Sequence, residues 1–121
     1  MLLITGASGF LGANILLEAR DAGREVVGAF NATPIGGNGI RVASGDLSRD
    51  GAPEELLETV RPDWVLNCAA LANVDTCERE PERATEINVE LARKLAVSCR
   101  EAGVRLLHVS TDAVFDGRSG N

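Results

Sequence analysis

Short apolar runs alternate along the chain with segments whose apolar residues recur at helical spacing. The run at residues 2–5 is short and ends at a glycine, which predicts a buried strand. In the next segment Leu11, Ile15, Leu16 and Ala19 fall at three- and four-residue spacing, which predicts a helix. The predicted strands are residues 2–5, 26–30, 40–43, 64–68 and 105–110, and the predicted helices are residues 10–22, 50–60 and 81–102.

This alternation indicates an α/β fold with a parallel sheet. Strands that are apolar throughout are buried on both faces, so the amphipathic helices should cover both sides of the sheet. Residues 31–39 have turn composition and are too few for a helical crossover, so we expect an irregular connection there. The chain has 121 residues and no linker, low-complexity tract or internal repeat, which predicts one domain over residues 1–121.

The composition excludes several classes of partner. The net charge of −6 argues against nucleic acid or an anionic membrane surface as a partner. No apolar stretch approaches the roughly 20 residues that span a bilayer, and no signal peptide is evident. Cys68, Cys77 and Cys99 are odd in number and lack Cys-x-x-Cys spacing, so they indicate cytoplasmic thiols and neither a disulfide framework nor a metal site. The lone His108 is expected to be structural.

Gly6, Gly9 and Gly12 lie three residues apart between the first predicted strand and the first predicted helix. Gly6 would permit a tight exit from the strand, Gly9 would let a pyrophosphate approach the backbone, and Gly12 would let the helix pack closely. The spacing is one residue longer than the standard dinucleotide fingerprint, and no Lys-Ser/Thr pair follows, which excludes a P-loop. Three turn glycines without a ligand are the alternative, but the position favours a phosphate site. Ser8, Phe10 and Leu11 complete this loop.

Ligands of open α/β sheets bind beyond the carboxyl ends of the strands. The second strand is followed by Asn31, where an acid would normally bind the ribose hydroxyls of NAD, and no Arg or Lys occurs before Arg41. The missing carboxylate removes a repulsion, so NADP(H) is slightly favoured over NAD(H). After the third strand, Asp46 could accept a hydrogen bond from an adenine amino group while Leu47 packs on the ring. A helix cap or turn explains Asp46 equally well.

The fourth and fifth strands end in small and hydroxyl-bearing residues. Residues 70–72 would let a flat group lie close to the backbone, although small residues also simply pack well. Val109, Ser110 and Thr111 close the fifth strand, where a hydroxyl could hydrogen-bond a substrate carbonyl or alcohol. A Ser/Thr turn is the alternative there.

Four segments occur in the order and spacing of one known family: TGASGFLG, GDL, NCAALANVDTCEREPERATEIN and HVSTDAVFDG. Together they resemble the extended short-chain dehydrogenase/reductases, and most closely the dTDP-4-dehydrorhamnose reductase branch. The resemblance covers essentially all 121 residues. It implies an open parallel sheet of Rossmann type, with about five strands in the order 3-2-1-4-5 and helices on both faces. It also implies NAD(P) as cofactor and a nucleotide-linked keto-sugar as substrate.

The resemblance assigns roles to individual positions. It makes the glycine loop the pyrophosphate site, residues 46–47 the adenine contact and residues 70–72 the nicotinamide side. Asn88 matches an asparagine that supports the active-site water network, and Thr111 matches the catalytic hydroxyl residue, with Ser110 beside it. The predicted cofactor-binding residues are Gly6, Ser8, Gly9, Phe10, Leu11, Gly12, Asn31, Asp46, Leu47, Ala70, Leu71, Ala72, Asn88 and Val109, and the predicted catalytic residues are Thr111 and Ser110.

Two features depart from the family pattern. Ala113 replaces an aromatic residue that often occurs at this position, and the catalytic Tyr-x-x-x-Lys is absent, since the chain has no tyrosine and stops at Asn121. A threonine hydroxyl is too weak an acid to replace that tyrosine, so we predict a domain truncated before the Tyr-x-x-x-Lys and the substrate lobe, inactive alone. A non-catalytic NAD(P)-binding regulatory or interaction module is the alternative. The sheet would expose an edge, so we also expect a homo-oligomer or a further covering segment.

Overall fold

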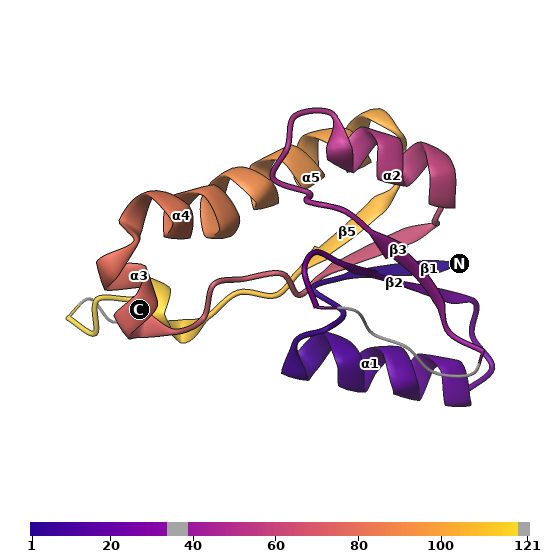
Figure 1. Ribbon diagram of the computed structural model, residues 1–121, viewed down its shortest axis with the longest axis horizontal. Coiled ribbons are helices and arrows are strands. Elements are labelled where there is room, and N and C mark those ends of the chain that lie inside the picture. Colours follow the sequence, from indigo (N-terminus) through magenta and orange to yellow (C-terminus); the bar gives the residue numbers. More distant parts are fainter. Residues whose placement is uncertain (34–38, 119–121) are drawn as a thin grey trace.

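The computed structural model describes residues 1–33 and 39–118, in which helices flank an open sheet (Figure 1). All five strands run parallel, in the order β3-β2-β1-β4-β5. The strands are β1 (Leu2–Thr5), β2 (Val26–Phe30), β3 (Arg41–Ser44), β4 (Trp64–Asn67) and β5 (Arg105–His108). The predicted α/β class, Rossmann-type sheet and strand order are thus confirmed.

The central strand β1 is buried because its alternate side chains enter two cores on opposite faces of the sheet. Leu3 packs in a cluster with Val65 and Cys99 on one face, and Ile4 packs in a cluster with Leu16 on the other. Figure 1 shows α1 on one side of the sheet and α2 with α5 on the other, as predicted. These helices are α1 (Phe10–Asp21), α2 (Ala52–Val60) and α5 (Leu91–Glu101).

Several predicted boundaries are wrong by one or two residues, which is the usual uncertainty of element ends. The fourth strand ends at Asn67 and the fifth at His108, because these two residues form the last pair of the β4–β5 register. The second helix begins at Ala52, after Gly51 at a φ of 80°. The third strand is Arg41–Ser44, one residue later at each end than the predicted 40–43. The connection predicted over 31–39 falls largely on residues 34–38, outside the described residues.

The long helix predicted over 81–102 is present but not regular. It consists of α4 (Pro81–Thr85), a π-helical turn η1 (Glu86–Glu90) and α5. A short helix α3 (Val74–Arg79), which the sequence analysis missed, precedes it; the side chain of Asn73 caps α3 by accepting from Thr76 N–H at 2.8 Å. Figure 1 shows α3 and α4 extending beyond the carboxyl ends of the strands. Among the described helices, none is both long and apolar enough to cross a membrane.

Side-chain hydrogen bonds tie the carboxyl ends of three strands together. The Thr5 hydroxyl donates to Asn67 Oδ1 at 2.5 Å, and the Ala69 N–H donates to the same oxygen at 3.1 Å. Asn67 Nδ2 lies 2.9 Å from His108 Nδ1; because an amide nitrogen only donates, His108 Nδ1 is the acceptor. Thr5 and Asn67 are buried away from water, so the Thr5 hydroxyl depends on Asn67 for its hydrogen bond. His108 therefore has the structural role that was expected.

Replacing Asn67 with leucine should lower the free energy of unfolding by about 1–3 kcal/mol, because the buried Thr5 hydroxyl and the Ala69 N–H lose their acceptor. Urea unfolding followed by circular dichroism would measure this change. The control is Asn14→Leu, since Asn14 is exposed and bonds only its own helix, at Phe10 O, among the contacts described. Equal stability of the two variants would show that the network contributes nothing.

Candidate functional site

The carboxyl ends of β1, β2 and β3 open into a cleft of about 400 Å³. Gly6 and Ser8 form one wall, and the segments that follow β2 and β3 form the next. The opposite wall comes from the long helix, far away in sequence. Its contributions are Arg83, Glu86, Ile87 and Leu91. The cleft therefore brings the glycine turn and the long helix, which are far apart in sequence, together at the edge of the sheet where α/β proteins bind their ligands.

The turn after β1 is possible only with glycine. Gly6 has a φ of +65°, and a Cβ there would lie 2.6 Å from Ala69 N, on the loop that follows β4. A Cβ at Gly12 would lie 2.4 Å from Gly6 O, so the first turn of α1 packs directly on the glycine turn. Gly9 N–H donates to Gly6 O at 3.0 Å and closes the turn. Gly6 and Gly12 are thus required by close backbone contacts.

The N-terminus of α1 lies beside this turn and is open to solvent. Its N-cap is Gly9, and within the described residues no side chain caps the helix and no acid occurs in its first turn. Ser8, Gly9, Phe10 and Leu11 are all exposed. The first N–H groups of a helix lack partners inside the helix, and the helix dipole favours an anion there. These residues fit a phosphate group.

The exits of β2 and β3 carry polar groups into the cleft. Asn31 and Thr33 are exposed there, and no carboxylate stands at position 31. Asp46 accepts a hydrogen bond from Ser48 N–H at 3.0 Å, which is the turn role considered above. The same Asp46 also lines the cleft beside the half-buried Leu47, so the turn presents both residues to a ligand.

The loop after β4 is held by Asn88. The Leu71 N–H donates to Asn88 Oδ1 at 2.8 Å, and Asn88 Nδ2 donates back to Leu71 O at 3.1 Å. Cys77 Sγ adds a third contact to Leu71 O, at 3.2 Å. Asn88 lies in the π-helical turn, a feature that occurs often at functional sites. Its amide therefore holds Leu71, the middle residue of 70–72, by two hydrogen bonds to the Leu71 backbone.

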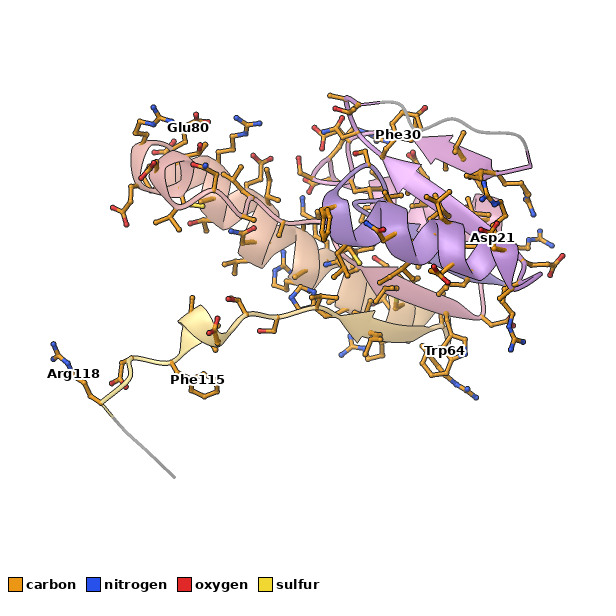
Figure 2. The ribbon with its side chains drawn as sticks, turned by 90° about the horizontal axis from the view of Figure 1, so that it is seen from below. Asp21, Phe30, Trp64, Glu80, Phe115 and Arg118 are labelled. Carbon is orange, nitrogen blue, oxygen red and sulfur yellow. The ribbon has the colours of Figure 1, made fainter. Side chains whose placement is uncertain are left out.

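The segment after β5 carries the predicted catalytic residues, Ser110 and Thr111, and both are exposed. The Thr111 hydroxyl accepts from Ala113 N–H at 3.2 Å and caps the 3-10 turn η2 (Asp112–Val114). This is the Ser/Thr turn that stood as the alternative. Figure 2 shows the segment with Phe115 and Arg118 projecting away from the rest of the molecule.

The predicted site residues fall into three groups. One group lines the cleft, one forms the N-terminus of α1 beside it, and one lies outside the described cleft lining. The first is Gly6, Ser8, Asn31, Asp46 and Leu47, the second is Gly9, Phe10, Leu11 and Gly12, and the third is Ala70, Leu71, Ala72, Asn88, Val109, Ser110 and Thr111. Their roles toward a ligand remain predictions.

Sequence reasoning missed the contribution of the long helix. Ile87 and Leu91 belong to its apolar face, so the spacing predicts a core role for them, and Arg83 belongs to the charged set on the other side. The only sequence signal was the four-residue spacing of these three positions, which places them along one helix face. In the structure that face closes the cleft.

The electrostatics of the cleft are set by three charged groups among its described residues, Arg83, Asp46 and Glu86. Arg83 Nη1 donates to Glu80 Oε2 at 2.8 Å, and this bond, with the nearby Glu86, raises the pKa of Arg83 above its usual value.

Burial raises the pKa of the Cys68 thiol, which keeps it protonated at neutral pH. Within the part of the chain described, no cluster of His, Cys, Asp and Glu could hold a metal ion.

The model of the RmlD substrate binding domain family matches residues 1–121. The chain belongs to this family. Similar curated relatives include the dTDP-4-dehydrorhamnose reductase of Streptomyces griseus, 39% identical over 98% of this chain and 35% of that protein. The probable low-salt glycan biosynthesis reductase Agl14 of Haloferax volcanii is 35% identical over 96% of this chain and 38% of its own length. The methionine adenosyltransferase 2 subunit beta of Xenopus laevis is 34% identical over 97% and 34%.

Solved structures of similar fold support the assignment to the RmlD family. A hypothetical dTDP-4-dehydrorhamnose reductase from Sulfolobus tokodaii is 38% identical, with a TM-score of 0.85 over 99% of this chain and 42% of that one. MoeE5, in complex with UDP-glucose and NAD, has a TM-score of 0.83 at 30% identity over 98% and 39%. The Bacillus anthracis dTDP-4-dehydrorhamnose reductase, in complex with NADP, has a TM-score of 0.78 at 27% identity over 98% and 38%. The chain thus spans well under half of these proteins.

Gly12→Ala should destabilise this domain of the RmlD family although alanine is the better helix former by about 1 kcal/mol. The added Cβ meets the backbone oxygen of Gly6, which cannot move without opening the turn, so we expect a net loss of about 1–3 kcal/mol in urea unfolding. Gly45→Ala is the control, since a Cβ there would meet no described atom within 4 Å and Gly45 has no positive φ. A Gly12→Ala variant as stable as that control would contradict the packing argument.

Proposed function

We propose that this chain is the NAD(P)-binding portion of an oxidoreductase that reduces a nucleotide-linked keto-sugar. The observation that carries the proposal is the open N-terminus of α1 beside the cleft at the carboxyl ends of β1, β2 and β3. The family, the names of the relatives and the dinucleotides bound by the similar structures support it. NADP(H) is slightly favoured over NAD(H), because Asn31 stands where an acid would repel a 2′-phosphate.

Different residues of the site would bind different parts of the dinucleotide. The first N–H groups of α1 would hold the pyrophosphate, and Asp46 with Leu47 would meet the adenine from one side of the cleft. Ile87 and Leu91 would cover the adenine from the helix wall, where apolar side chains exclude water. The dinucleotide, when bound, supplies the hydride that reduces the keto carbon. Residues 70–72, with Leu71 held by Asn88, would lie at the nicotinamide end.

Titration calorimetry of the 121-residue chain with NADPH and with NADH should show binding. Gly9→Asp should weaken both by about tenfold or more, because a carboxylate at the N-cap competes for the N–H groups that the pyrophosphate needs and repels it. The matched control is Gly9→Asn, which has the same size and the same capping ability but no charge.

Absence of binding of either dinucleotide at millimolar concentration would refute the proposed function. Equal affinities for Gly9→Asp and Gly9→Asn would refute only the placement of the pyrophosphate at this helix. A Cβ at position 9 would lie 3.2 Å from Gly6 O in both variants, so the two should have similar stability, and thermal unfolding would check this.

The 121-residue chain should bind the cofactor without turning over substrate. It contains no tyrosine, so the proton donor used by the resembled reductases is missing, and Thr111 is engaged in its own turn. Absorbance at 340 nm, with NADPH and a nucleotide-linked keto-sugar, is the measurement. Steady oxidation of NADPH that depends on the sugar would contradict this expectation.

A second candidate is a non-catalytic NAD(P)-binding module that acts on a partner protein. The similarity to a methionine adenosyltransferase subunit, over 97% of this chain, favours it. The two candidates differ in the coding sequence beyond Asn121. A Tyr-x-x-x-Lys within a few dozen residues of that position supports the reductase, and its absence from a longer product supports the module.

A further inference from the structure

Arg83 is the one basic side chain among the described residues that line the cleft. It lies on α4, far in sequence from the glycine turn, yet it borders the same space as Asn31, Ala32 and Thr33 at the exit of β2. Figure 2 shows Glu80, at the start of α4, on the same upper side of the molecule as Phe30, the last residue of β2. The helix α4 thus brings a guanidinium to the cleft that the residues after β2 also line.

The exit of β2 is the place where dinucleotide-binding folds distinguish their two cofactors. A carboxylate there binds the 2′-hydroxyl of NAD, and an arginine nearby accommodates the 2′-phosphate of NADP. This chain has neither group in the described residues directly after β2, which are the neutral Asn31, Ala32 and Thr33. Any cationic partner for a 2′-phosphate must therefore come from another element that borders the cleft.

Arg83 is free enough to turn toward such a ligand. Its present partner is Glu80, and the two side chains are 59% and 44% exposed. Exposed ion pairs of this kind are weak, so a phosphate can compete with Glu80 for the guanidinium. Asp46 and Glu86 also border the cleft and would repel a phosphate, which leaves Arg83 as the group that offsets them.

We propose that Arg83 binds the 2′-phosphate of NADP(H) and so determines the cofactor preference of this domain. The inference rests on the proposed function and adds to it the residue that distinguishes the two cofactors. An arginine suits this role because its planar fork donates two parallel hydrogen bonds to phosphate oxygens. Arg83 acts by binding alone, so it should affect NADPH and leave NADH unchanged.

The test is titration of the 121-residue chain and of Arg83→Ala with NADPH and, separately, with NADH. We expect the NADPH affinity to fall by about ten- to a hundredfold, as for the loss of a hydrogen bond between charged groups, and the NADH affinity to change less than about twofold. Arg93→Ala is the matched control. Arg93 bonds Glu90 at 2.9 Å with the same exposures, 59% and 44%, but lies outside the described cleft lining.

The outcomes separate this inference from the function on which it rests. Equal weakening of NADPH and NADH by Arg83→Ala would overturn the assignment, since it would place Arg83 at a group that both cofactors share. An unchanged NADPH affinity, or the same loss in Arg93→Ala, would also overturn it while the proposed function stands. If the unsubstituted chain binds neither cofactor, the proposed function fails and this inference fails with it.

Discussion

The arrangement of the cleft depends on the close contact between the turn after β1 and the loop after β4. Gly6 lies so near the backbone of Cys68 and Ala69 that no side chain fits between them, and Gly12 lies equally close to Gly6. These contacts determine where α1 begins and where the loop after β4 leaves the sheet. The exposed end of α1 and the cleft beside it follow from that arrangement, because a bulkier turn would push the helix away from the strands.

Polar contacts reinforce the same edge of the sheet. The buried pair Thr5 and Asn67 joins β1 to β4, and Asn67 also holds the Ala69 N–H beside the glycine turn. Asn88 acts in a similar way on the loop after β4, where its side-chain amide hydrogen-bonds both the N–H and the C=O of Leu71. The walls of the cleft nearest the sheet are therefore fixed by backbone contacts and by amides. The opposite wall depends largely on α4 and the π-helical turn η1, in whose described residues no side chain is buried.

The sheet could be predicted from the sequence because its strands are short apolar runs and its helices have periodic apolar faces. The glycine turn was also evident, since the spacing of Gly6, Gly9 and Gly12 has few other uses between a strand and a helix. The helix α3 was missed because a six-residue helix with no buried residue leaves no apolar period. The place of Arg83 could not be predicted, since it depends on how α4 lies over the cleft.

The π-helical turn at Glu86–Glu90 affects the direction in which side chains of the long helix (residues 81–101) point relative to the cleft. In a regular helix each step of four residues advances by about 40° beyond a full turn, so Arg83, Ile87 and Leu91 would share one face but drift across it by about 80°. A π-helical turn accommodates one additional residue, which takes up this drift and lets all three positions border the same cleft. The insertion or deletion of one residue in this turn would therefore redirect the whole helix wall while every side chain in it stayed the same.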